Sequence, residues 1–158
     1  MKYWFTSDTH FSHKNIIKYC NRPFDSVEQM DAELIKRWNE VVKPEDVVFH
    51  LGDLCFKNKS LDDYRKVLNG TIILLKGNHE NGNSIIDDMM ISLNGYSFFL
   101  THRPENCKGE FNLCGHIHEK WRVKREGERL LINCGVDVND FYPIDIDTII
   151  EMIENNKV

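Results

Sequence analysis

The stretch Val47-Val48-Phe49-His50-Leu51-Gly52-Asp53 decides the fold, because it reads as a short buried strand that ends in a glycine and a carboxylate. Its β-branched and aromatic residues favour a strand, and Pro44 and Gly52 bound a run too short for a helix. Other apolar runs end in the same way: Tyr3–Phe5 before Asp8-Thr9-His10, Ile72–Leu75 before Gly77-Asn78-His79-Glu80, Tyr96–Leu100 before Thr101-His102, and Phe111–Cys114 before Gly115-His116-Ile117-His118. In open α/β sheets, ligands and metals bind at the carboxyl ends of strands. The sequence therefore predicts a metal centre assembled from strand ends, with Asp53 in its middle.

The segments between these strands in the first half have helical patterns. The clearest helix is expected over residues 26–42, where Ser26 followed by Gln29 is typical of a capping box. A second helix is expected over residues 60–69, with a strand over residues 71–76 directly after it. Strands that alternate with helices favour a parallel sheet with right-handed connections.

The second half has shorter strands. Residues 121–125 and 129–133 flank Gly127 and predict a hairpin. A closing helix is marked by apolar residues at helical spacing, which are Ile146, Ile149, Ile150 and Ile153. The second half therefore looks mostly antiparallel. For the chain we predict an α/β fold of two packed mixed β-sheets, a β-sandwich flanked by helices, in a single domain that spans residues 1–158.

The composition excludes several classes of protein. With 41% hydrophobic and 28% charged residues the chain is typical of soluble globular domains. No apolar run approaches the ~20 residues of a membrane helix, and the amino terminus does not resemble a signal peptide. The five cysteines form no C-x-x-C pair, which favours reduced thiols and a cytoplasmic protein. The net charge of −5 argues against general nucleic-acid binding, but bound metals would still allow a phosphate substrate.

The seven histidines lie outside the two strongest helical patterns. Imidazole and carboxylate together suit Zn, Mn, Fe or Ni better than Ca or Mg alone. Asp8 and His10 alternate along the chain, as do His116 and His118, so each pair would share one face of an extended strand. With Asp53 added, these groups exceed what one tetrahedral zinc requires. The candidates Asn78 and His102 make the set large enough for two metals that share one carboxylate.

Taken in order, these motifs resemble the calcineurin-like metallophosphoesterase superfamily. The pattern is D-x-H, G-D, G-N-H-[DE], a lone histidine and G-H-x-H. It stands here as Asp8-Thr9-His10, Gly52-Asp53, Gly77-Asn78-His79-Glu80, His102 and Gly115-His116-Ile117-His118. Only residues 103–114 separate the last two motifs, so no cap is inserted there and the site should be open and shallow. The chain is most similar to a small branch found in bacteria and phages.

The resemblance implies a role for each motif residue. Asp8, His10 and His118 would hold the first metal; Asn78, His102 and His116 would hold the second; and Asp53 would bridge both. The cofactors would be two divalent or trivalent ions, manganese foremost, with iron, zinc or nickel as alternatives. A metal-bound hydroxide would attack phosphorus, and His79 would be the catalytic general acid that protonates the leaving oxygen.

The expected function is therefore dinuclear, metal-dependent hydrolysis of phosphate esters. A phosphodiesterase is slightly favoured, because the arginine that protein phosphatases of this superfamily carry after the G-D motif is absent here. The alternatives are a phosphomonoesterase and a non-catalytic binding or scaffold module, as in the retromer subunit that resembles this superfamily. The substrate would be a small phosphate ester or a nucleotide.

Other residues near the motifs are weaker candidates. His13 is either structural or a contact to a substrate phosphate, and Arg22, Arg103 and Lys57 are candidate cations for substrate binding. His50 is expected to be structural or to orient a ligand. Glu80 is expected to cap its loop. Residues 133–137 form either a buttress of the site or a turn.

Overall fold

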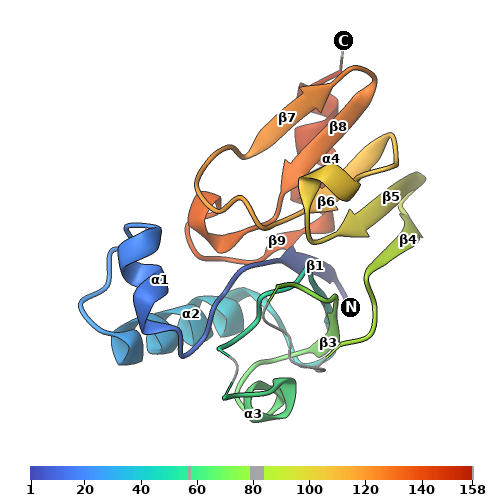
Figure 1. Cartoon of the computed structure of the whole chain (residues 1–158). Helices are drawn as coiled ribbons and strands as arrows, with labels where there is room; N and C mark the ends of the chain where they lie inside the picture. The colour runs from blue at the N-terminus through green and yellow to red at the C-terminus, as the bar shows by residue number, and fades with distance from the viewer. Residues whose placement is uncertain (57, 79–83, 158) are drawn as a thin grey trace.

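The computed structural model describes residues 1–56, 58–78 and 84–157, and the statements below concern these residues. Two mixed β-sheets pack together with helices against them, as Figure 1 shows. This arrangement confirms the predicted α/β class. In the described part of the chain, no helix combines the length and the apolar character that crossing a membrane requires.

The first sheet has four strands in the order β3-β2-β1-β9. Their bounds are β1 Tyr3–Thr6, β2 Val47–His50, β3 Thr71–Leu74 and β9 Ile144–Asp145. β1, β2 and β3 run parallel, with Tyr3 beside Val47 and Val47 beside Thr71, whereas β9 is antiparallel to β1. Because the parallel strands start in register, their carboxyl ends meet at one edge of the sheet.

Helices α2 (Val27–Val41) and α3 (Leu61–Arg65) lie against the outer face of this sheet, and α1 (Lys14–Tyr19) stands to its side (Figure 1). Met30, Leu34 and Trp38 of α2 are buried against outward-facing residues of the sheet such as Val48. The Gln29 amide donates to the side chain of Ser26, which confirms the expected helix start. The second predicted helix is shorter than expected, since α3 ends at Arg65.

The second sheet has five strands in the order β4-β5-β6-β8-β7. Their bounds are β4 Asp88–Leu93, β5 Tyr96–Thr101, β6 Phe111–Cys114, β7 Val123–Glu126 and β8 Arg129–Asn133. The edge pairs β4–β5 and β7–β8 are hairpins, and the second of these confirms the predicted turn at Gly127, whose φ is 62°. β5, β6 and β8 are parallel, however. The expectation of a mostly antiparallel second half is therefore wrong.

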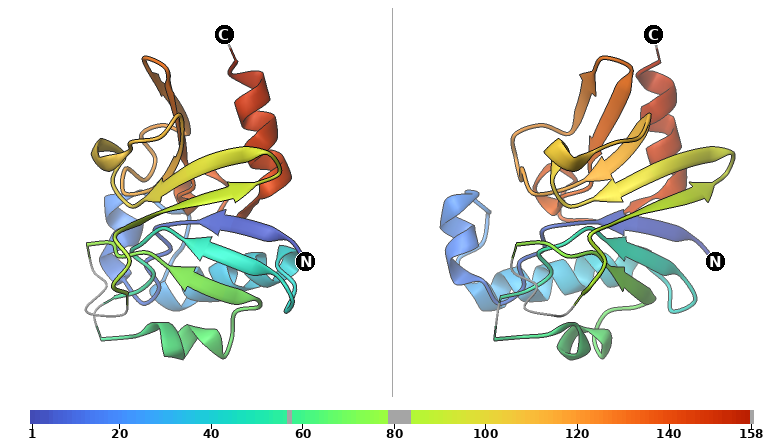
Figure 2. Two further views of the ribbon diagram at one scale, coloured as in Figure 1. Left: turned by 90° about the vertical axis from the view of Figure 1, so that its right-hand side faces the viewer. Right: turned by 45° about the vertical axis from the view of Figure 1, so that its right-hand side comes forward.

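A second core lies between the two sheets. Phe5 and Phe49 stack with ring centroids 5.4 Å apart on the first sheet, and they belong to the same buried cluster as Phe98 of the second. The closing helix α4, Ile146–Asn155, adds Ile149 and Ile153 to that cluster, and Figure 2 shows it standing beside the second sheet. Two short 3₁₀ helices complete the fold, η1 Pro104–Asn106 and η2 Val136–Val138. This core fixes both sheets so that their strand ends face one another.

Candidate metal centre

The loops that leave the strand ends are joined by backbone hydrogen bonds. The Asp8 amide donates to the carbonyl of Gly52 at 3.0 Å, and the His10 amide donates to the carbonyl of Asp53 at 3.1 Å. In the second sheet, the Gly115 amide donates to the carbonyl of His102 at 2.9 Å. These bonds hold the expected ligands of neighbouring strands side by side.

The ligand-bearing loops are not extended. Left-handed backbone recurs at the expected ligands, with φ of 57° at Asp8, 52° at His10, 58° at Asp53, 73° at His116 and 49° at His118. The expectation that the D-x-H and H-x-H pairs alternate along extended strands is therefore wrong. Non-glycine residues adopt this conformation at a cost, and such residues cluster at functional sites where the surroundings hold them.

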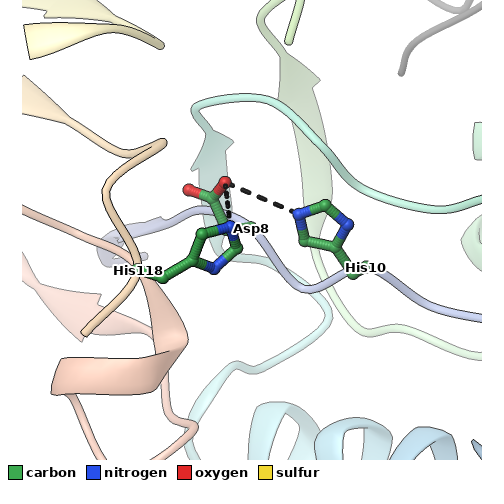
Figure 3. A group of neighbouring side chains, drawn as sticks. All are labelled: Asp8, His10 and His118. Atoms are coloured by element: carbon green, nitrogen blue, oxygen red, sulfur yellow. Dashed lines mark ion pairs between the residues drawn. The ribbon is translucent and has the colours of Figure 1, made fainter. Parts of the chain in front are cut away.

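The first cluster consists of Asp8, His10 and His118, which converge in Figure 3. Asp8 Oδ1 lies 3.7 Å from His10 Nε2 and 3.9 Å from His118 Nε2. This oxygen is buried and has no hydrogen-bond partner among the described residues. Two ligands that are each ~2.1 Å from one ion lie about 3.4 Å apart at tetrahedral angles. The donor set, its spacing and the orphaned oxygen thus fit a metal ion.

The second cluster consists of Asp53, His102 and His116, whose ligand atoms lie within 4.8 Å of one another. Asp53 Oδ2 is 3.3 Å from His102 Nε2 and 3.5 Å from His10 Nε2, so one oxygen faces both clusters. The other oxygen, Asp53 Oδ1, accepts a hydrogen bond of 2.7 Å from the backbone N–H of Asn78. Asp53 therefore lies between the clusters in the position that a bridging ligand requires.

Hydrogen bonds to Nδ1 orient the imidazoles. His102 Nδ1 donates to the carbonyl of Leu51 at 2.8 Å, and His118 Nδ1 donates to Asp137 Oδ2 at 3.0 Å. His10 Nδ1 lies 3.1 Å from His13 Nδ1. In each case Nε2 is left to face a carboxylate of the clusters. Partners of this kind fix the tautomer and the ring plane of metal-binding histidines.

Charge and burial set the protonation of the first cluster. Burial raises the pKa of the Asp8 carboxyl, but His10 and the other nearby histidines outweigh burial and hold that pKa far below its usual value. Burial lowers the pKa of His118, but the hydrogen bonds to Asp137 and Cys20 and the charge of Asp8 together outweigh burial and raise the pKa to about 10. A metal ion must displace the proton of His118, so metal binding at this cluster should release protons.

A cavity of ≈ 530 Å³ opens beside both clusters. Its lining includes His10, Asp53, His116 and His118, together with Asn78. A larger hollow of ≈ 880 Å³ lies elsewhere, between the turns around Gly109 and Gly127, away from the ligand clusters. A space of the size of a small-molecule site therefore adjoins the candidate ligand clusters.

Comparison with known proteins assigns the family. The domain of the calcineurin-like phosphoesterase superfamily matches residues 1–139 of the chain. The chain belongs to this superfamily. The match spans every motif from Asp8 to His118, so the order of the strand-end motifs and the family match agree.

This superfamily member is similar to other proteins over most of its length. The chain is 40% identical over 168 residues to the uncharacterized protein MJ1445 of Methanocaldococcus jannaschii, with 99% of this chain and 94% of that protein covered. It is similar to the crystal structure of the protein of unknown function AQ665 from Aquifex aeolicus, with a TM-score of 0.75 and 28% identity over 96% of this chain and 98% of that one. Vps29 from Entamoeba histolytica shares the fold, with a TM-score of 0.53 and 18% identity over 84% and 73% of the two chains.

One expected substrate contact of this superfamily member is corrected by the structure. Arg22 pairs with Asp137 through Nε to Oδ1 at 2.9 Å and Nη2 to Oδ2 at 3.0 Å. It also donates to the carbonyls of Asp8 at 2.7 Å and Thr9 at 2.8 Å. Its side chain is 0% exposed, so it lies behind the ligands and does not face a substrate.

The other expected contacts lie at the site. His13 stacks on Phe56 with ring centroids 4.8 Å apart, and both line the cavity. Arg103 is exposed and donates to Asn78 Oδ1, while Asn78 Nδ2 donates to His116 Nδ1 at 3.0 Å. Arg103 thus occupies the oxygen that Asn78 would offer to a second metal. Lys57, His79 and Glu80, for which the sequence also predicts roles, lie outside the described residues.

His50 has the structural surroundings that its position suggested. Its Nδ1 accepts from the Gly52 amide at 3.2 Å, and its Nε2 lies 3.0 Å from Thr9 Oγ1, which donates to the carbonyl of Leu54 at 2.7 Å. Burial lowers the pKa of His50 to about 3, so the ring stays neutral. It links the loops after β1 and β2 and lies behind the ligands.

The segment 133–137 is a buttress of the site. Asn133 Nδ2 donates to the carbonyls of His118 and Trp121, both at 2.9 Å, and Asn133 Oδ1 accepts from the Gly135 amide at 2.8 Å. At the other end of the segment, Asp137 holds His118 and Arg22. The sequence signalled this segment only as polar residues after a strand, and it missed the pairing of Asp137 with Arg22.

Proposed function

We propose that this chain is a metal-dependent phosphoesterase that binds two ions at the strand ends and hydrolyses phosphate esters. The observation that carries the proposal is the position of Asp53, whose Oδ2 faces His10 Nε2 at 3.5 Å and His102 Nε2 at 3.3 Å. A carboxylate between two imidazole clusters is the arrangement that a shared ligand needs. Manganese is the first expectation for both ions, with iron, zinc and nickel as alternatives that suit the same donors.

The proposed ligands fall into one set for each ion and one shared carboxylate. Asp8, His10 and His118 would hold one ion; His102, His116 and Asn78 would hold the other; and Asp53 would bind both. When bound, such a pair of ions polarises the phosphoryl oxygens and lowers the pKa of water toward neutrality. Asp137 would keep the plane of His118 fixed through its hydrogen bond of 3.0 Å. The motif position of His79 supports its role as the proton donor to the leaving oxygen.

A phosphodiester is the favoured substrate class. A monoester dianion usually calls for an added cation, and Arg22, one of the expected cations, is buried in an ion pair with Asp137. Arg103 is at the site, but its Nη2 donates to Asn78 Oδ1 and its Nη1 lies 3.7 Å from Glu105 Oε1. The diester, with one charge fewer, fits these surroundings better. A small ester or a nucleotide would be the natural partner of such an open site.

Metal analysis and a substrate panel together test the proposal. The purified protein would be analysed for bound ions and assayed on mono- and diesters with Mn²⁺, Ni²⁺, Zn²⁺ and Mg²⁺. We expect two ions per chain and metal-dependent hydrolysis that is faster for diesters. A protein that holds two ions but hydrolyses none of the esters would instead favour a non-catalytic binding module on this fold.

A further inference from the structure

A row of aromatic rings extends from the first ligand cluster along one wall of the cavity. The His13 ring lies 5.2 Å from the His10 ring and stacks on Phe56 at 4.8 Å and 29°. On its other side, Tyr19 meets His13 edge to face at 6.5 Å and 79°. All of these residues line the ≈ 530 Å³ cavity. The row therefore begins at an expected ligand and ends at the cavity mouth.

Tyr19 is unusually open for an aromatic residue. It is the last residue of α1, and 68% of its surface is exposed. An exposed ring beside other apolar lining residues of a cavity leaves a face on which a planar ligand can pack. Ile16 and Ile117 line the same cavity and make this wall more apolar.

A neighbouring cavity has a different lining. A second cavity of ≈ 460 Å³ shares Asn78 with the first. Its charged lining residues are Lys76, Arg103 and Lys108, with Asp87 and Asp88. Among the described residues, no ion pair joins Lys76 or Lys108 to a carboxylate. The expected metal centre thus adjoins both a cavity with aromatic lining and a polar cavity whose lining includes Lys76 and Lys108.

We propose that the aromatic row Phe56–His13–Tyr19 is a stacking subsite for a planar ring, and that the preferred substrate is a nucleotide-like phosphodiester. The base of this substrate would lie on the aromatic row, and its phosphorus would lie at the ligand clusters. The polar group esterified on the other side of the phosphorus would extend toward Lys76 and Lys108. The volume of the cavity is within the ~300–1,000 Å³ of small-molecule sites. Stacking on aromatic side chains accepts any base, because every base has a π-face. This inference rests on the proposed phosphoesterase function.

The test measures binding of two probes that differ only in the base. Adenosine 5′-monophosphate and ribose 5-phosphate would each be titrated by calorimetry into the manganese-loaded protein. We expect the nucleotide to bind at least about ten-fold more tightly, in line with typical base–aromatic stacking. Tyr19→Leu and Phe56→Leu should each reduce this ratio several-fold, since leucine keeps apolar volume but removes the ring plane. Tyr19→Phe should retain the ratio.

A matched control removes an exposed apolar side chain from another place. Met90 on β4 is 59% exposed and lies outside both cavities, so Met90→Ala should leave the ratio of the two dissociation constants unchanged. Thermal unfolding of each variant would verify that it is folded. Tyr19 and Phe56 are tested separately, so that loss of folding in one variant leaves the other to decide.

The subsite and the proposed function fail in different ways. Equal binding of the two probes by the wild-type protein would overturn the subsite, as would a ratio that both leucine variants leave unchanged. Hydrolysis of simple diesters by that same protein would leave the phosphoesterase function standing. Conversely, base-dependent binding that depends on Tyr19, without hydrolysis of any ester, would retain the subsite and overturn the catalytic proposal.

Discussion

Replacement of Arg22 by alanine distinguishes a buried supporting residue from a substrate contact. Arg22 and Asp137 form a two-pronged ion pair at 2.9 and 3.0 Å, with side chains that are 0% and 3% exposed. Removal of one partner from a buried pair typically costs ~3–5 kcal/mol, because the other charge is left buried and uncompensated. The carbonyls of Asp8 and Thr9 would also lose their guanidinium donors. For a protein of this size the loss corresponds to a fall in Tm of roughly 6–20 °C.

The same change should weaken metal binding at the first cluster. Asp137 orients His118 through Nδ1 at 3.0 Å, and Arg22 holds both oxygens of that carboxylate. Disturbing the partner of a metal-binding histidine typically costs ~10–100-fold in affinity. We therefore expect Arg22→Ala to lose affinity for one manganese ion by about that factor, while the second cluster changes less.

Two assays and two controls make the result specific. Thermal and denaturant unfolding of the chelator-treated protein would give stability, and calorimetric titration with Mn²⁺ would give affinity. Arg22→Lys keeps the charge but loses the planar fork, so it should lie between wild type and Arg22→Ala. Arg65→Ala removes an exposed pair with Asp62, at 57% and 86% side-chain exposure, and should change stability by less than ~1 kcal/mol.

A different pattern would refute this reasoning about Arg22. If Arg22→Ala kept the Tm and both manganese affinities of the wild type but raised KM for an ester, the side chain would contact substrate. The original expectation from the sequence would then hold, and the buried position of the guanidinium would not be the one that it has in solution.

The remaining predictions concern the bridge, the general acid and a structural carboxylate. Asp53→Asn keeps the shape of the side chain but removes the shared charge, so both ions should bind more weakly. If elemental analysis of the variant found two ions per chain, and titration found both affinities unchanged, Asp53 would not be the bridge. His79→Asn should lower kcat by ~10²–10⁴-fold for an ester with a poor leaving group and by far less for p-nitrophenolate, with metal content retained; equal slowing of both substrates would exclude the general-acid role. Burial raises the pKa of Asp46, but hydrogen bonds from the Lys43 and Lys2 amides and the Trp4 indole outweigh it and lower that pKa. A carboxyl with a lowered pKa stabilises the fold above its ordinary pKa of about 3.9 and loses that contribution as pH falls further. Asp46→Asn should therefore destabilise the protein at pH 7, and denaturant unfolding should show the difference from wild type shrinking between pH 5 and pH 2.

Local signals in the sequence were sufficient for the strand ends. The run Val47–Asp53 has the β-branched residues, the glycine and the carboxylate that mark a buried strand and its turn, and β2 forms over Val47–His50. The order of the motifs then placed Asp53 between imidazole clusters, where the structure has it. The assigned roles of these ligands, the single-domain organisation and the cytoplasmic location stay predictions, since proximity alone does not test them.

Long-range pairing is what the sequence could not supply. Arg22 and Asp137 are 115 positions apart, and neither lies in a motif of the ligand set. An arginine in an irregular segment is as compatible with a substrate contact as with a buried pair, and only packing decides between them. The strand order of the second sheet is similar in kind, because β6 and β8 are parallel neighbours although β7 comes between them in the chain.

The left-handed turns at the expected ligands are a local geometry that the sequence did not indicate. An alternating D-x-H pair was expected on an extended strand, whereas β1 ends at Thr6 and both Asp8 and His10 have positive φ. Aspartate and histidine tolerate this region better than most residues, but it still has to be held by its surroundings. Here the holding groups are the Asp8 and His10 amides bonded to the neighbouring loop, and the Arg22 guanidinium bonded to the carbonyls of Asp8 and Thr9. The positive φ angles thus occur at the expected ligands, and Arg22, which is paired with Asp137, holds the backbone there. Local propensity fails at such a place because the fold as a whole, and not the segment, selects the backbone.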